Sequence, residues 1–385
     1  MTLDEVISLK SEMESEFEKP AAGLRLLQNS LDAGLANRFV QSLISRPLRE
    51  LPMIFDASTP GLVSAALRGR SVTPNLVAAA KALSAQGAED DTAMPNLTVG
   101  YSEVSQHQYR AEVRFQRASV RTVLLAREVA RRANGEVRIG EYRDLKSLGD
   151  AVVPGPAVDR LPIGSSVGHQ KGPAGSLGLF LKSNEGPGIV SNSHVFARCG
   201  KARRGDPIYA PHPQDTKDPR EIATLRYFSD LVHEDEVPFD AAFALLKDGL
   251  PSNANIIPQG MPQSGKRLTE TKVLAANLGL EVCKVGRTSK HTTGTLSAVA
   301  VSPTIEYPGL GDVKLSGMLE VQWEAPDKEF SKPGDSGSAV YRPDTMEVFG
   351  IVVGGGVRIV EGKDEGVSIV CPLDVFMKEW NLSFA

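Results

Sequence analysis

The sequence predicts a mainly β protein, in which the β structure follows a helical region and a small mixed unit. The chain of 385 residues contains 36 glycines and 25 prolines, which are common in the turns between short strands. From residue 156 onward, short apolar runs alternate with Gly, Pro, Asn and Ser, as in GIVSNSHVFA, FDAAFALL and VFGIVVGGG. Many short strands over so long a segment favour closed or sandwiched β structure.

Residues 1–92 are expected to form a helical region. Thr2 and Glu5 match a capping box, and the apolar residues that follow fall near helical spacing. A second apolar stripe ends before Pro47, and Thr73-Pro74 is typical of the start of another helix. Nothing in these helices indicates chemistry, so we expect them to pack on the rest of the chain or to bind a protein partner. The polar segment GAEDDTAMP, residues 87–95, is the predicted linker.

Residues 93–155 are expected to form a small ββαβ unit. The run NLTVGYSEV is typical of a strand, and in QYRAEVRF apolar residues alternate with charged ones, which predicts a half-buried strand. The segment SVRTVLLAREVARRA has a helical pattern, and EVRIGEYR predicts a third strand. The β structure predicted above then occupies residues 156–385.

The charge and the cysteines exclude several classes of protein. A net charge of −4 gives no reason to expect nucleic acid as a partner. The N-terminus lacks the basic start and apolar stretch of a secretory signal, and no run approaches the roughly 18 apolar residues that span a bilayer. Cys199, Cys283 and Cys371 are widely spaced, which favours reduced thiols. We therefore expect a cytoplasmic protein with no membrane segment and no cofactor.

Three local patterns carry chemistry when they are taken together. His194 follows an apolar strand in GIVSNSHVFA, Asp240 stands at the head of another in FDAAFALL, and Ser336 lies in the glycine-flanked loop of KPGDSGSAVYR. A serine hydroxyl becomes a nucleophile when an imidazole accepts its proton, and the imidazole needs a carboxylate to fix its tautomer. Taken alone, a histidine after a strand is more often a core or surface residue, and the aspartate and the GDSGS segment would be ordinary turn residues. Their joint occurrence in the order His, Asp, Ser predicts a catalytic triad.

The surrounding residues support this triad over the alternatives. Glycines around Ser336 let the chain curl, and we assign the oxyanion donors to the backbone N–H groups of Gly334 and Ser336. Asp230 and Asp235 lie in the polar stretch SDLVHEDEVP, so Asp240 is the preferred acid. The remaining histidines show no paired metal spacing, which disfavours a zinc hydrolase: His107, His169, His212, His233 and His291.

On these motifs, residues 160–385 resemble a bacterial trypsin-like serine peptidase. The segment VGRTSKHTTGTL is similar to a GRTTG-containing strand pair of the streptogrisin and α-lytic branch, and GVSIVCPLDVFMKEW to the closing strand and C-terminal helix of such domains. The ββαβ unit followed by RLPIGSSVG resembles a bacterial and plant group that includes the plant NARROW LEAF regulators. The resemblance implies a chymotrypsin-like double β-barrel, with His194 and Asp240 in the first barrel and Ser336 in the second.

The resemblance also implies where substrate specificity is set. The base of the primary pocket would be Phe330, six residues before Ser336, and its edge strand Val353-Gly354-Gly355. No acidic residue stands at that base, which disfavours a preference for Lys or Arg and favours a small or apolar side chain. The alternative, in which Phe330 belongs to the core and the pocket is built otherwise, stays open.

The sequence departs from the resembled family in two ways, one at the usual disulfide and one at the activation site. Val195 follows His194 where relatives have a cysteine, so the usual disulfide is absent, which agrees with a reducing compartment. No activation site is recognisable ahead of the barrel, so the carboxylate of Asp335 beside the nucleophile needs another cation. The similar arginine of the streptogrisin-like branch pairs with the matching aspartate, which makes Arg287 the expected partner.

The expected function is a serine endopeptidase that hydrolyses peptide bonds of a protein or peptide substrate through an acyl-enzyme. The alternative from another class is a regulatory or binding scaffold that keeps the peptidase fold with little turnover. A third possibility is self-cleavage in the linker at residues 87–95. The oligomeric state is not predicted by the sequence.

Overall fold

The structure is a computed structural model that describes residues 1–17, 97–105, 108–116, 129–130, 132–147, 161–270, 279–323, 329–360 and 363–385. The chain divides into two compact units. Unit 1 comprises Met1–Arg143 and Arg358–Glu365, and unit 2 comprises Asp144–Val357 and Gly366–Ala385. The helices predicted between residues 18 and 92, the linker at 87–95 and both predicted domain boundaries lie outside the described residues. No helix in the described part of the chain is long and apolar enough to cross a membrane.

In the described part of unit 1, helix α1 packs on a small sheet. Helix α1 (Leu3–Phe17) begins at the predicted capping box, where the Thr2 N–H donates to Glu5 Oε2 at 2.7 Å and the Glu5 N–H to Thr2 Oγ1 at 3.3 Å. Strand β1 (Leu97–Ser105) pairs antiparallel with β2 (Gln108–Phe115), and β2 pairs parallel with β3 (Val137–Ser147). The helix buries Val6, Leu9 and Met13 in the core that these strands share. The three strands of the predicted ββαβ unit are thus confirmed, and most of its predicted helix lies outside the described residues.

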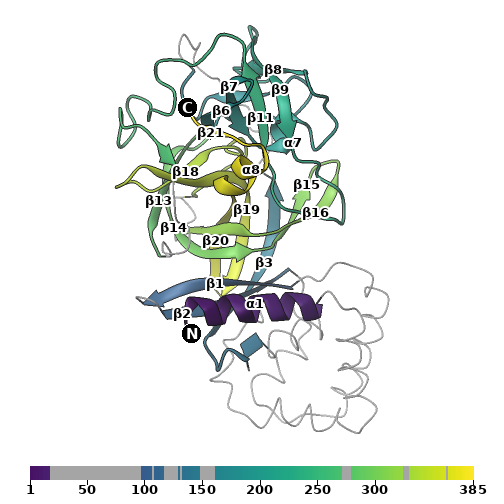
Figure 1. Cartoon of the computed structure of the whole chain (residues 1–385), viewed down its shortest axis with the longest axis vertical. Coiled ribbons are helices and arrows are strands. Elements are labelled where there is room, and N and C mark those ends of the chain that lie inside the picture. The colour runs from purple at the N-terminus through teal and green to yellow at the C-terminus, as the bar shows by residue number, and fades with distance from the viewer. Residues whose placement is uncertain are drawn as a thin grey trace. The chain divides into compact units, whose positions relative to one another are not determined.

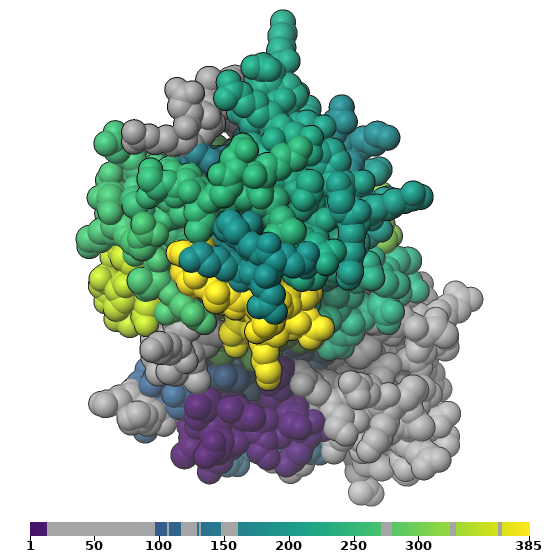
Figure 2. Space-filling view, turned by 45° about the horizontal axis from the view of Figure 1, so that its top comes forward, coloured from purple at the N-terminus to yellow at the C-terminus, as the bar shows by residue number. Residues whose placement is uncertain are grey.

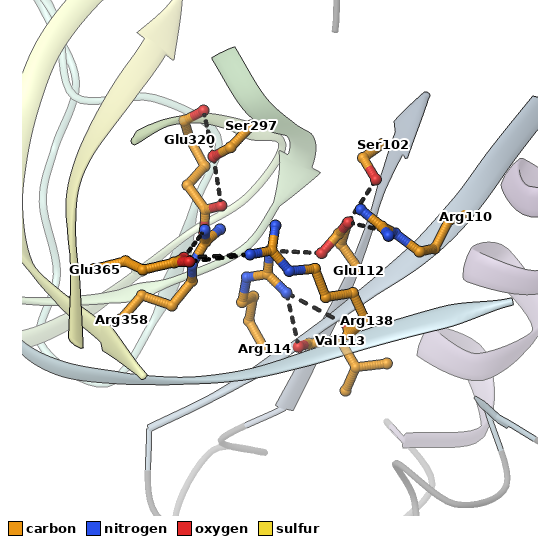
Figure 3. Close-up of polar contacts among 10 residues, drawn as sticks. All are labelled: Ser102, Arg110, Glu112, Val113, Arg114, Arg138, Ser297, Glu320, Arg358 and Glu365. Carbon is orange, nitrogen blue, oxygen red and sulfur yellow. Dashed lines mark hydrogen bonds and ion pairs between the residues drawn. The ribbon is translucent and has the colours of Figure 1, made fainter. Parts of the chain in front are cut away.

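The charged face of β2 differs from the prediction, because Glu112 and Arg114 are fully buried rather than half-buried. Glu112 Oε1 accepts from Arg110 Nε at 3.1 Å and Oε2 from Arg114 Nη2 at 2.7 Å, and the Ser102 hydroxyl also donates to this carboxylate (Figure 3). A carboxylate is tolerated in the interior only when such partners compensate for its lost hydration. Sequence alternation showed that the face is charged but not that ion pairs allow its burial.

A second group of ion pairs in unit 1 joins the last residues of β19 (Glu347–Val360) and the first residues of β20 (Lys363–Pro372) to β3. Glu365 on β20 accepts from Arg358 Nε at 3.0 Å and from Arg138 Nη2 on β3 at 3.2 Å (Figure 3). The pKa of the Arg138 guanidinium is lowered, first by burial and then by the positive charge of Arg358, and the carboxylates of Glu112 and Glu365 only partly oppose this change. These pairs connect Arg358 and Glu365 to β3.

In the first half of unit 2, the described residues form an eight-stranded sheet with the order β21-β6-β7-β11-β9-β8-β4-β5. Its neighbours pair antiparallel, and its strands are β4 (Ser166–His169), β5 (Gly175–Ser176), β6 (Leu179–Ser183), β7 (Gly186–Ser191), β8 (Pro207–Ala210), β9 (Arg220–Phe228), β11 (Ala242–Leu246) and β21 (Ser383–Phe384). Figure 1 shows β6, β7, β8, β9 and β11 of this sheet close together. Inward side chains such as Phe180, Ile189 and Phe243 are fully buried. This half is the first barrel.

The second half of unit 2 closes on itself. Strand β13 (Glu281–Gly286) pairs with β14 (Lys290–Val301), β14 with β17 (Met318–Trp323), and β17 with β20. Strand β18 (Ala339–Tyr341) joins β13 to β19, and β19 lies beside β20 in the same sheet. The circuit therefore returns to its start, as a barrel requires. The expected mainly β fold with a chymotrypsin-like double β-barrel is confirmed.

Short elements complete unit 2. They are α7 (Ser193–Phe196), β10 (Glu236–Val237), β12 (Thr269–Glu270), the hairpin of β15 (Thr304–Tyr307) and β16 (Gly311–Leu315), and α8 (Leu373–Glu379). Figure 2 shows the C-terminal residues in yellow at the surface, beside residues of the first barrel in teal. There Trp380 stacks on Tyr227 with ring centroids 5.9 Å apart and meets Phe239 edge-on at 5.2 Å. The C-terminal segment thereby fixes the residue that precedes Asp240.

Candidate active site

His194 lies in α7, the short helical turn that follows β7. The polar residues before it, Asn192 and Ser193, anchor this turn. Asn192 Nδ2 donates to the Asp240 carbonyl at 2.7 Å, and the Ser193 hydroxyl donates to the Ser229 carbonyl at 2.6 Å. Because Ser191 at the end of β7 pairs with Ala242 on β11, the turn lies at the edge where β11 begins.

The structure brings His194 and Asp240 together at this edge. Nδ1 of His194 lies 2.6 Å from Oδ2 of Asp240, and the backbone N–H of His194 donates to Oδ1 at 3.2 Å. Both side chains are buried. Asp230 and Asp235, the alternatives for the acid, are exposed. An ionised carboxylate on Nδ1 requires that nitrogen to carry the proton, which leaves Nε2 as an acceptor.

Tyr307, at the end of β15, is part of the site and was not predicted. Its hydroxyl donates to Asp240 Oδ2 at 3.0 Å, and its ring meets the His194 ring at a centroid distance of 5.5 Å and an angle of 61°. Burial, and then the charge of Asp240, raise the pKa of the Tyr307 phenol well above its usual value. The segment TIEY shows strand alternation, which indicates that Tyr307 points inward. No local pattern indicates which residue it meets.

The loop around Ser336 is held by the first barrel. Ser176 on β5 donates its hydroxyl to the Gly334 carbonyl at 2.9 Å and its N–H to the Ser336 carbonyl at 2.7 Å. Gly334 has φ +95°, a conformation that residues with a side chain rarely adopt. Its N–H makes no hydrogen bond within the described part of the chain, so it is available to an oxyanion. Ser176 was missed because its two-residue strand carries no periodic signal.

The expected hydrogen bond between Ser336 and His194 is not made in this conformation. The Ser336 hydroxyl donates instead to the Val353 carbonyl at 3.1 Å, and among the described residues His194 Nε2 has no hydrogen-bond partner. The loop and the histidine turn meet at Gly175, where an added Cβ would lie 2.9 Å from the Ser336 carbonyl and 2.6 Å from Val195 Cγ2. Transfer of the hydroxyl proton to His194 therefore requires Ser336 to rotate away from Val353.

The predicted pair of Arg287 with Asp335 is wrong. The cation beside Asp335 is Lys284 on β13, with Nζ 3.2 Å from Oδ2 and both side chains fully buried. The Asp335 carboxylate also accepts from the backbone N–H groups of Thr288, Ser289 and Lys332 and from the Ser289 hydroxyl. Burial lowers the pKa of the Lys284 ammonium, and the neighbouring Asp335 raises it.

Arg287 instead binds Asp215 with both arms of its guanidinium, Nε to Oδ2 at 2.6 Å and Nη2 to Oδ1. Its backbone N–H is held by the Ser176 hydroxyl at 2.9 Å, and its Nη1 lies against Gly334. The physical reason for the exchange is that Asp335 is already saturated by donors, whereas the buried Asp215 presents a carboxylate suited to a bidentate partner. Arg287 therefore contacts the nucleophile loop without neutralising it.

The residues expected to form the specificity pocket are Phe330 and the β19 residues Val353, Gly354 and Gly355, all of which the structure describes. Phe330 is fully buried, and its ring would be 2.9 Å from a Cβ added at Gly294. A Cβ at Gly355 would lie 3.3 Å from the Ser331 hydroxyl and 3.7 Å from that of Ser368. These two hydroxyls, which the sequence did not single out, bond to each other. Val353 and Gly354 are buried on β19. A Cβ added at Gly354 would lie 2.5 Å from the Lys146 carbonyl oxygen, so the two backbones are in close contact there.

Metal ligands are not grouped in this region. No cluster of three or more His, Cys, Asp or Glu side chains in the described part of the chain is arranged to hold a metal ion. Burial raises the pKa of the Cys199 and Cys283 thiols to about 12, and it also raises that of Cys371. All three cysteines are free thiols.

Comparisons with known proteins identify the family. Solved structures that resemble the chain include Cellulomonas bogoriensis chymotrypsin, at 19% identity over 58% of this chain and 98% of that one with a TM-score of 0.38. They also include Thermobifida fusca protease A, at 17% over 58% and 97% with 0.38, and Nocardiopsis protease, at 18% over 58% and 97% with 0.39. Among curated proteins, none matches the chain. The sequence model of the family described as Trypsin matches residues 175–377, more than half of the chain, and the chain therefore belongs to the trypsin family.

Proposed function

We propose that the protein is a serine endopeptidase that cleaves a protein substrate through an acyl-enzyme. Ser336 is the nucleophile, His194 the general base and acid, and Asp240 the group that orients the imidazole. The backbone N–H groups of Gly334 and Ser336 bind the oxyanion. The observation that carries this proposal is the buried contact of 2.6 Å between His194 and Asp240, beside a nucleophile loop that Ser176 fixes in place.

The steps follow from the contacts. Ser336 rotates from the Val353 carbonyl toward Nε2 of His194, which takes its proton as Oγ attacks the substrate carbonyl. The negative oxygen that forms is stabilised by the Gly334 and Ser336 N–H groups. His194 then protonates the leaving amine, which gives the acyl-enzyme. Water, deprotonated by His194, attacks this ester and restores Ser336.

The loop needs no activating cleavage in this proposal. In unit 2 the charge of Asp335 is neutralised by Lys284, a residue of the same barrel, at 3.2 Å. The backbone N–H donors of Thr288, Ser289 and Lys332 hold the same carboxylate. The loop conformation is therefore fixed within the folded unit, and the chain is expected to be active as made.

A fluorophosphonate probe tests the proposal, because it labels only an organised serine nucleophile. The full-length protein should be labelled at Ser336, and Ser336→Ala should not be labelled. Ser297→Ala is the matched control, since this serine donates to Glu320 on the second barrel and takes no part in the site. Folded protein that resists labelling would contradict the proposal.

A second candidate function is a trypsin-fold scaffold that binds a partner with little turnover. It is favoured by the hydrogen bond of Ser336 to Val353 in place of His194. The fluorophosphonate experiment separates the two candidates, because a scaffold without an organised nucleophile would not be labelled at Ser336. The Ser336→Ala variant gives a second distinction: a scaffold would still bind its protein partners equally well, whereas an endopeptidase would lose cleavage of its substrate.

Finer properties follow as proposals from the sequence. We expect a small or apolar side chain before the scissile bond, because Phe330, the residue expected at the base of the pocket, is not acidic. We propose a bacterial, cytoplasmic enzyme, which the three free thiols support. The proposed relationship to the streptogrisin and α-lytic branch depends on sequence motifs. Arg287 differs from the matching arginine of that branch because it pairs with Asp215. A partner for the N-terminal helices remains a prediction.

A further inference from the structure

The carboxylate of Asp240 has one side-chain donor besides His194 in the described part of the chain. Its Oδ2 accepts from His194 Nδ1 at 2.6 Å and from the Tyr307 hydroxyl at 3.0 Å, while Oδ1 accepts from the backbone N–H of His194 at 3.2 Å. The Tyr307 ring also packs edge-on against the imidazole. One residue from the β15–β16 hairpin therefore touches both the acid and the base.

We propose that Tyr307 is a positioning residue for the proposed reaction, which holds the Asp240 carboxylate and the His194 ring in the geometry that proton transfer requires. The inference rests on the proposed function. Without the hydroxyl, rotation of the carboxylate would be opposed on Oδ2 only by His194 itself. The ring edge restrains the imidazole from a second direction.

The hydroxyl remains a donor over the working range of an enzyme. Burial and the Asp240 charge keep the phenol protonated, since both raise its pKa. Among the described residues, the thiols of Cys199 and Cys371 also lie near enough to feel the charge of Asp240, and their raised pKa values keep these two thiols neutral. The hydrogen bond from Tyr307 withdraws negative charge from Asp240 and so limits how strongly the carboxylate stabilises the protonated imidazole.

Loss of the hydroxyl should therefore make His194 easier to protonate. Tyr307→Phe keeps the ring and its packing and removes only the donor. We expect the acid limb of the pH profile of kcat/KM to move upward by about half a unit to one unit, since a hydrogen bond to a charged group accounts for a shift of this order. At neutral pH kcat should fall about tenfold with KM unchanged, because Tyr307 is buried and so is shielded from a bound substrate.

Tyr341→Phe is the matched control. Tyr341 is also buried, and its hydroxyl has no hydrogen-bond partner among the described residues. This variant loses the same atom at a position away from Asp240. It should keep the wild-type pH profile and kcat.

A second measurement does not depend on turnover. The hydrogen-bonded Nδ1 proton of His194, observed by NMR and assigned with His194→Gln, should move downfield in Tyr307→Phe, because a carboxylate with one donor fewer binds this proton more tightly. An unchanged resonance in Tyr307→Phe, or an equal change in Tyr341→Phe, would overturn the inference. If the wild-type protein is not labelled by a fluorophosphonate, the proposed function fails, and the proton resonance still decides the role of Tyr307.

Discussion

Lys284 has an environment that suits an ammonium group better than a guanidinium. Its three N–H donors have three acceptors, which are Asp335 Oδ2 at 3.2 Å, the Ser289 hydroxyl at 2.6 Å and the Lys290 carbonyl at 3.2 Å. The side chain is fully buried, so the planar fork of an arginine would have to displace packed neighbours. Lys284 lies on β13, and neither its charge nor its spacing from other residues is unusual in the sequence. The sequence therefore gave no local signal of its role.

Removal of the Lys284 charge should disorder the nucleophile loop. Lys284→Met leaves Asp335 buried without a cation, which costs about 3–5 kcal/mol of unfolding free energy for a broken buried pair. Urea denaturation should show this loss, and fluorophosphonate labelling of Ser336 should be abolished. The control is Lys182→Met, at an exposed position on β6. If Lys284→Met were labelled at the wild-type rate, Lys284 would not support the loop.

Among the elements, β5 contributes most to the site for its length. Its Ser176 donates to Gly334 and accepts from the Arg287 N–H, and its carbonyl accepts from the Ser191 hydroxyl at 2.9 Å. This strand of two residues thus joins the loop around Ser336 to the end of β7, which precedes His194, and to the turn that contains Arg287.

Ser176→Ala should loosen this junction. It leaves the buried Gly334 carbonyl and Arg287 N–H without their partner, and about 1–3 kcal/mol is typical for each such loss. We expect a lower urea midpoint and slower labelling of Ser336. Ser183→Ala, which removes a hydroxyl bonded to Gly186 in a turn, should change neither. Equal labelling rates in the two variants would assign Ser176 to stability alone.

The buried ion pair on β2 leads to a separate prediction about the stability of unit 1. Glu112→Gln removes the charge that balances the fully buried Arg114. Breaking a buried pair in this way costs about 3–5 kcal/mol, and the unfolding transition of unit 1 should move to lower urea. Glu12→Gln is the control, because its carboxylate is 60% exposed. A shift of equal size in both variants would show that the buried pairing has no special weight.

The predictable features of this chain are those encoded locally. The capping box at Thr2, the strands of the ββαβ unit and the surroundings of His194 and Asp240 each depend on a few adjacent residues. Tyr307 and Ser176 act on groups far away in sequence, so their roles depend on strand register and barrel closure. The Arg287 pairing was transferred from a resemblance, and it failed because the donors that saturate Asp335 come from residues the resemblance did not specify.

At the scale of the whole molecule, strands run from one compact unit into the other. β19 lies in unit 2 through Val357, where Val352 and Val353 contact the nucleophile loop, and continues in unit 1 from Arg358. β3 likewise leaves unit 1 after Arg143. The residues proposed for chemistry nevertheless all belong to unit 2, and the core that α1 completes belongs to unit 1.

This division predicts that damage to the core of unit 1 leaves the chemistry of unit 2 in place. Val6 is fully buried in the core beneath α1, whereas its neighbour Ile7 is 43% exposed. Val6→Asp places an unpaired carboxylate in that core, which should move the unfolding of unit 1 to lower urea. The second barrel closes through its own strand pairs, so labelling of Ser336 should stay within about threefold of the wild-type rate, a difference below 1 kcal/mol. Ile7→Asp is the control and should alter neither measurement. Loss of labelling in folded Val6→Asp, with Ile7→Asp unaffected, would show that the chemistry of unit 2 depends on an intact unit 1.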